Sequence, residues 1–133
     1  ERSDRAAAAE QGINPFLFNN AIWSAGLMAK AAGADFAAFA SQMVHACSEP
    51  LLRGVGASAT HDSTTMTNAA VCIGRIASVC PGEVAATLGE LGLWVRWLDE
   101  LSQVAEGEEK VDGYAGLVLL CNTSPDMAAS SPE

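Results

Sequence analysis

The sequence predicts an all-α protein built from stacked helical repeats, because it repeats itself, has helical periodicity and lacks alternating strand patterns. Setting Asn20 on Asn68 aligns two similar segments at an offset of 48 residues. The same offset places Gly26 on Gly74, and a fainter third copy places Gly116 on Gly74 at an offset of 42 residues. Helical repeats of about 40–47 residues are typical of HEAT and armadillo solenoids. The predicted fold class is therefore a HEAT-repeat α-solenoid.

Five antiparallel helices are expected, and together they make about two and a half repeats. Their predicted ranges are 14–32, 35–52, 63–80, 82–103 and 108–122. Residues 1–13 are predicted to be a truncated or flexible leader, and residues 123–133 a flexible tail. We therefore expect the chain to be a piece of a longer solenoid.

Capping residues predict where the first two helices begin and end. Asn14 followed by Pro15 is typical of a helix start, because asparagine caps free N–H groups and proline has none to lose. Gly33 predicts the end of the first helix. Pro50 predicts a kink or break near the end of the second helix, and the small residues of 53–62 predict a loop.

The later helices begin at similar signals. Asp62 or Ser63 is expected to cap the third helix, and Pro81 to open the fourth. A turn of glycine and acidic residues precedes the fifth helix. The prolines and serines after Thr123 predict a loose tail.

An apolar stripe on each of three helices predicts the core. Spacings of three and four residues place these side chains on one helix face. The stripes are Met66, Ala69, Ile73, Ile76 and Cys80; Val84, Leu88, Leu91, Val95 and Leu98; and, by the repeat offset, Phe18, Ala21, Ala25, Met28 and Ala32. Neighbouring helices are expected to pack against these faces.

Composition limits the classes of function. The chain has 133 residues, half of them hydrophobic, and 16 acidic residues against 7 basic ones give a net charge of −9. Nucleic acid is therefore not an expected partner, whereas a basic peptide is. The alternative is that the acidity only keeps an alanine-rich surface soluble. No apolar run approaches the roughly 18 residues of a membrane span, so no membrane association is expected.

Neither catalysis nor a cofactor is expected. His45 and Cys47 lie two positions apart on one helix, so they diverge by about 200° and cannot act as base and nucleophile. The four cysteines, which also include Cys72, Cys80 and Cys121, lack the close spacing of a metal site. They are predicted to be buried reduced thiols, which indicates a cytosolic or nuclear protein.

Trp23 is the centre of the candidate binding surface. It lies about 200° around its helix from Ala25, the centre of the predicted stripe, and therefore is expected to point away from the core with Asn19. The repeat places Val71 at the matching angle of the third helix, near Asn68 and Arg75. An aromatic ring flanked by amides suits peptide recognition. The alternative is that Trp23 packs against a neighbouring helix.

At these residues the chain resembles a known family, the transportins, which are import receptors of the importin-beta superfamily. The similarity runs from about Asn14 to Pro125 and keeps the order and approximate spacing of several motifs. The motifs are Asn19-Asn20-Ala21-Ile22-Trp23 with Gly26, Asn68-Ala69-Ala70-Val71 with Ile73-Gly74-Arg75, Val79-Cys80-Pro81, Glu83-Val84-Ala85 and Glu108-Glu109-Lys110. They look like the carboxy-terminal HEAT repeats of a transportin.

The resemblance implies a function in nuclear import. Transportins bind cargo through a disordered basic or hydrophobic localisation signal that ends in proline–tyrosine, and the GTPase Ran releases it. The implied partners are therefore a cargo signal peptide and, through the full-length receptor, Ran and nuclear pore proteins. The implied cargo-binding residues are Asn19, Trp23, Asn68 and Val71 on the concave inner helices, and the implied location is cytoplasm and nucleus.

Two features depart from the family pattern and leave alternatives open. Leu27 stands where the family often has an acid, and three residues are lacking between Pro15 and Asn19. The Ran-binding arch and the subsite for proline–tyrosine lie outside the similarity. A structural HEAT scaffold without a transport role, or a related receptor of the same superfamily, are the alternatives.

Overall fold

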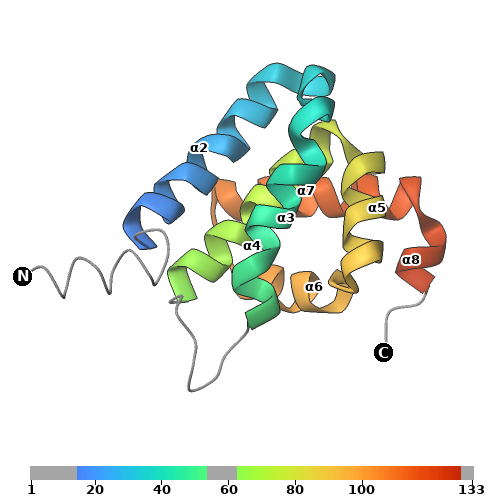
Figure 1. Ribbon diagram of the computed structural model, residues 1–133. Helices are drawn as coiled ribbons and strands as arrows, with labels where there is room; N and C mark the ends of the chain where they lie inside the picture. Colours follow the sequence, from blue (N-terminus) through green and yellow to red (C-terminus); the bar gives the residue numbers. More distant parts are fainter. Residues whose placement is uncertain (1–14, 54–62, 130–133) are drawn as a thin grey trace, which may run out of the picture.

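The computed structural model describes residues 15–53 and 63–129, which are helical with short connections and contain no strand (Figure 1). Its elements are α2 (Pro15–Ala32), the 3₁₀ helix η1 (Gly33–Phe36), α3 (Ala37–Arg53), α4 (Ser63–Val79), α5 (Pro81–Leu91), α6 (Trp94–Ser102), α7 (Glu108–Thr123) and α8 (Pro125–Ala129). The predicted all-α class is confirmed. The predicted leader 1–13, the cap Asn14 and loop residues 54–62 lie outside the described residues.

The helices form two layers, with α4 at the centre of the molecule (Figure 1). In one layer α4 packs between α2 and α7. In the other, α3 packs against α5 and α6, and all three also contact α4. Helices that alternate along the chain therefore share a layer, as expected of HEAT repeats stacked side by side.

The central position of α4 explains why its predicted stripe is correct. Met66, Ala69, Ile73, Ile76 and Cys80 are all buried. Burial in this helix extends much further than one stripe, since every residue from 69 to 77 is buried. A helix with neighbours on so many sides has no wide face left for solvent.

The prediction of one helix over 82–103 is wrong, because the helix ends at Leu91 and a turn at Gly92 precedes the next helix. This residue adopts a left-handed conformation, with φ of 65°. The N–H of Gly92 donates to the carbonyl of Gly89, and the N–H of Leu93 donates to that of Leu88, which is the Schellman arrangement that ends helices. The stripe predicted across the break is wrong only at Val95, which is 48% exposed: Val84 and Leu88 are buried, and Leu91 and Leu98 pack partly buried against the core.

The stripe predicted for the first helix is correct at Ala25 and partly at Phe18 but wrong at its other three positions, since the buried face of α2 is rotated by about one residue. Ile22, Ala25 and Ala29 are buried, whereas Met28 is 63% exposed. The physical reason is that α4 is buried almost all round, so its pattern does not define one direction that can be transferred to α2. The larger Ile22 is buried in place of Ala21.

Glycines allow α4 and α7 to cross at backbone contact. A Cβ atom on Gly74 would lie 2.6 Å from the Cα of Gly113. A Cβ on Gly116 would collide with the carbonyl oxygen of Gly74. The layer of α2, α4 and α7 therefore depends on the absence of side chains at this crossing.

The tail differs from the prediction too, since Pro125–Ala129 forms the short helix α8.

Candidate peptide-binding site

A row of side-chain contacts crosses α2, α4 and α7. It contains three of the four predicted site residues together with three charged residues. We call the set Asn19, Trp23, Lys30, Asn68, Arg75 and Asp112 the polar row. Its members form an amide pair, a cation–π contact and two ion pairs. The row therefore connects side chains of all three helices of one layer.

The amide pair joins α2 to α4. Asn68 Nδ2 donates a hydrogen bond of 2.7 Å to Asn19 Oδ1, and both side chains are half-buried. Each asparagine amide has two N–H donors and an acceptor oxygen, so this single bond leaves further donors and acceptors on both residues. The two predicted site asparagines are thus in direct contact and keep capacity to bind a peptide backbone.

The Trp23 ring is covered on one side by Arg75. The guanidinium carbon of Arg75 lies 4.5 Å from the ring centroid, within the range of a cation–π interaction. Gly26, which follows Trp23 by about one turn on α2, makes the approach possible: a Cβ there would lie 3.1 Å from Arg75 Cδ. Trp23 is half-buried rather than fully exposed, because the true core face of α2 lies nearer to it than predicted.

Asp112 of α7 neutralises two cations of the row. Its Oδ2 accepts hydrogen bonds of 3.0 Å from Arg75 Nε and from Lys30 Nζ. Partial burial alone would raise the pKa of Asp112, but the hydrogen bonds and charges of Lys30 and Arg75 outweigh it and lower the pKa below its usual value. The carboxylate is therefore held in its charged form.

We predict that Asp112→Asn lowers the free energy of unfolding by about 2 kcal/mol at neutral pH, because it removes charge-assisted hydrogen bonds and leaves Arg75 buried beside a neutral amide. The folded pKa of Asp112 is lowered, so its contribution is complete above the ordinary value of about 4 and is lost as the pH falls through the folded value. Urea titrations at several pH values measure this.

The two proteins should differ by a constant amount from about pH 7 to pH 5 and should converge in acid. Lys30→Met is the milder control, because its side chain is 38% exposed and Arg75 keeps its partner. A difference that grows as the pH falls would contradict the role assigned to Asp112.

Val71 is the predicted site residue that the structure places elsewhere. The prediction that it points outward with Trp23 is wrong, since Val71 is only 1% exposed. It lies on the α4 face between Asn68 and Arg75, and the central position of α4 leaves no room for a short side chain to reach solvent.

Arg75, Lys30 and Asp112 were not predicted as site residues. A signal was present for Arg75, because a lone cation within the apolar run of α4 must find a counter-charge when that helix is buried. Asp112 is the matching anion, one residue before Gly113 on α7. The pairing joins residues 37 positions apart, so only the fold reveals it.

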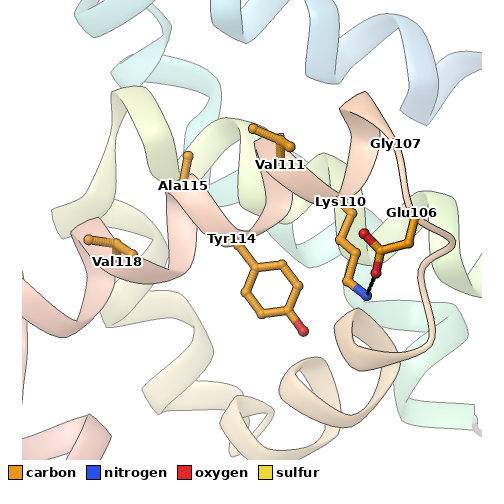
Figure 2. A pocket seen from close by; sticks show the side chains of 7 residues that line it. All are labelled: Glu106, Gly107, Lys110, Val111, Tyr114, Ala115 and Val118. Carbon is orange, nitrogen blue, oxygen red and sulfur yellow. Dashed lines mark hydrogen bonds and ion pairs between the residues drawn. The ribbon is translucent and has the colours of Figure 1, made fainter.

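A shallow hollow lies on the far side of α7. Figure 2 shows Tyr114 and Lys110 beside the apolar side chains of Val111, Ala115 and Val118, all on one helix. Lys110 is paired with the exposed Glu106 at 2.8 Å, and this hydrogen bond raises the pKa of Lys110. The lysine and glutamate of the hollow pair with each other, and the hollow lacks the amide donors and acceptors of the polar row.

All four thiols are free, and three of them are buried. Cys47, Cys72 and Cys80 are buried and free, as predicted, and Cys121 is half-buried. A hydrogen bond with Cys72, together with burial, raises the pKa of Cys47, so the thiol stays protonated. Within residues 15–53 and 63–129, no cluster of three metal-ligating side chains occurs and no helix is long and apolar enough to cross a membrane.

Comparison with known proteins agrees with this architecture. The chain is 28% identical to transportin-1 of Mus musculus and of Homo sapiens over 108 residues, which are 80% of the chain and 11% of each relative. It is 37% identical to importin subunit beta-2 of Schizosaccharomyces pombe over 106 residues, 78% of the chain and 11% of that protein. No family model matches the chain.

The stacked layers are those of an all-α helical solenoid, and the relatives give its class, the HEAT-repeat karyopherins of the importin-beta type. More particularly, it is homologous to one segment of transportin-1 and importin subunit beta-2, which confirms the resemblance seen in the sequence. Because it matches only 11% of the length of these relatives, it corresponds to a small part of such a protein.

Proposed function

We propose that this chain is part of a nuclear import receptor and binds the localisation-signal peptide of cargo proteins at the polar row. Homology to transportin-1 and importin subunit beta-2 supports the receptor class. In this proposal the GTPase Ran and nuclear pore proteins bind other parts of the full-length receptor, which moves between cytoplasm and nucleus. The chain itself supplies cargo contacts and no catalysis.

The observation that carries the proposal is the pairing of an amide cluster with a half-buried aromatic ring. Asn19 and Trp23 are four residues apart on α2, a rise of about 6 Å. Side chains on one side of an extended peptide recur about every 6.6 Å. A peptide that runs along α2 therefore finds hydrogen-bonding groups at the asparagines and an apolar contact one step further, at Trp23.

The charge of the chain favours the same kind of ligand. A net charge of −9 attracts a basic segment over long distances and raises the rate of encounter. The contacts at the row are those of an aromatic anchor and backbone hydrogen bonds. Attraction and anchoring thus come from different parts of the surface.

Trp23→Ala tests the proposal. The probe is a fluorescein-labelled peptide with an apolar amino-terminal segment, basic residues and a terminal proline–tyrosine, titrated with the 133-residue chain and followed by anisotropy. Truncating an aromatic anchor typically costs about 2–4 kcal/mol, so the affinity should fall about 30-fold or more. Circular dichroism should show retained helix, because the side chain lies at the edge of the core.

Tyr114→Ala is the matched control, since this partly exposed aromatic lies beside the hollow on the far side of α7. Its affinity should equal that of the unchanged chain. Equal affinities for Trp23→Ala and the unchanged chain would reject the site. A chain that binds no signal peptide at all would favour the structural scaffold.

A further inference from the structure

Arg75 has an effect on Trp23 beyond holding it in place. An indole ring attracts cations at its faces, and in this protein one of those faces is already occupied by the Arg75 guanidinium at 4.5 Å. A second cation stacked on the opposite face would share the same ring with a like charge. One of the two cation-binding faces of the Trp23 ring is therefore already occupied by a residue of the protein itself.

Arg75 cannot readily move aside for a ligand. Its side chain is only 4% exposed, and its Nε is bonded to Asp112 at 3.0 Å. Its stem passes Gly26, where a Cβ would stand 3.1 Å from Arg75 Cδ. The guanidinium is thus fixed from α4, α2 and α7 at once, and displacing it would leave a charge buried without its partners.

The surroundings of the ring are cationic or apolar on the α2 side. Lys30 brings a second positive charge to Asp112, so the three charged members of the row sum to a net positive charge. Leu27, one turn after Trp23, is 46% exposed and adds apolar area. The acidic side chain that α7 brings to this cluster is Asp112, and its Oδ2 is already shared by Arg75 and Lys30.

We propose that Arg75 is a specificity-determining residue, which makes Trp23 a contact for an apolar side chain of the peptide and rejects lysine or arginine at that position. The inference rests on the proposed peptide site and refines its ligand class. The basic residues of the peptide then lie away from the ring, and an aliphatic or aromatic residue contacts it. Arg75 acts on the ligand through the ring and its charge.

Two peptides that differ only at the residue expected to contact Trp23, leucine in one and arginine in the other, test this by anisotropy. The unchanged chain should bind the leucine peptide about fivefold or more tightly than the arginine peptide. Arg75→Met removes the charge and keeps most of the stem, while Asp112 keeps Lys30 as a partner. In this variant the arginine peptide should gain affinity and the preference should largely disappear.

Arg75→Lys is the matched control, because it keeps a charge beside the ring and should keep the preference. Equal binding of both peptides by the unchanged chain, or an unaltered preference in folded Arg75→Met, would overturn the inference while leaving the peptide site intact. If neither peptide binds, the proposed function itself fails. Should Arg75→Met unfold, tighter binding of the arginine peptide by the unchanged chain still refutes the inference, and tighter binding of the leucine peptide supports it.

Discussion

Gly116→Ala should separate α7 from α4 and lower the free energy of unfolding by about 3 kcal/mol. The added methyl group would collide with the carbonyl oxygen of Gly74. Backbone atoms form this obstacle, so no side chain can rotate away to relieve it. Alanine is the better helix former by about 1 kcal/mol, but this gain is smaller than the cost of pushing two helices apart. Urea denaturation followed by circular dichroism measures the difference.

Gly82→Ala is the control for this substitution. Gly82 lies in the first turn of α5, and nothing stands within 4 Å of a Cβ placed there. The same chemical change should therefore be neutral or stabilising by up to about 1 kcal/mol. If Gly116→Ala were as stable as Gly82→Ala, the close crossing of α4 and α7 described here would be wrong.

The same variant should also affect the candidate site. Asp112 reaches Arg75 only because α7 lies against α4, so a displaced α7 removes the anion that fixes the guanidinium. A Gly116→Ala protein that remains folded should lose part of its peptide preference along with its stability. Packing at the glycines and geometry at the polar row are therefore coupled.

Local signals were sufficient to predict most helices. Pro15 and Gly33 frame the first helix, and the described bounds of α2 agree with them. The apolar stripe predicted for α4 was also correct. This helix has so many apolar residues that the stripe is buried whichever helices pack beside it. These features depend on residues close in sequence, so capping chemistry and helical period determine them.

The break at Gly92 was missed although its signal was local. The apolar residues before and after it continue with helical spacing, and this pattern favoured one long helix. Glycine followed by a buried leucine is also the signature of a Schellman end, and this chemistry determined the outcome. Leu93 is 2% exposed, so the turn itself is part of the core.

The candidate site was predictable only in part. The ion pair of Arg75 with Asp112 and the burial of Val71 both depend on neighbours distant in sequence. The family resemblance implied Asn19 and Asn68 as site residues on two different helices, and the structure joins them by a hydrogen bond. Val71 aligns with Trp23 in the repeat, yet it is buried because α4 lies at the centre of the molecule. A repeat offset predicts the angle at which a side chain leaves its helix, but it does not predict how many neighbouring helices cover that side of the helix.

Trp97→Ala should be the most destabilising of the substitutions considered, with a loss of about 3–5 kcal/mol. Trp97 is fully buried, and its Nε1 donates a hydrogen bond of 2.9 Å to the carbonyl of Ala70 in α4. It also stacks obliquely on Trp94, with ring centroids 5.6 Å apart. Truncation therefore opens a cavity beneath the short helix α6 and removes its main attachment to the central helix. Urea titration by circular dichroism measures the loss without relying on tryptophan emission.

Trp97→Phe separates volume from hydrogen bonding. It keeps most of the aromatic ring but lacks the N–H group, so the hydrogen bond to Ala70 alone should cost about 1 kcal/mol, with a further small loss for the missing ring atoms. A loss for Trp97→Phe as large as for Trp97→Ala would show that the hydrogen bond, rather than the filled volume, holds α6 in place. A loss below about 1 kcal/mol for Trp97→Ala would mean that α6 does not dock on α4. In that case the second layer would consist of α3 and α5 alone, and α4 would be open to solvent beside Ala70.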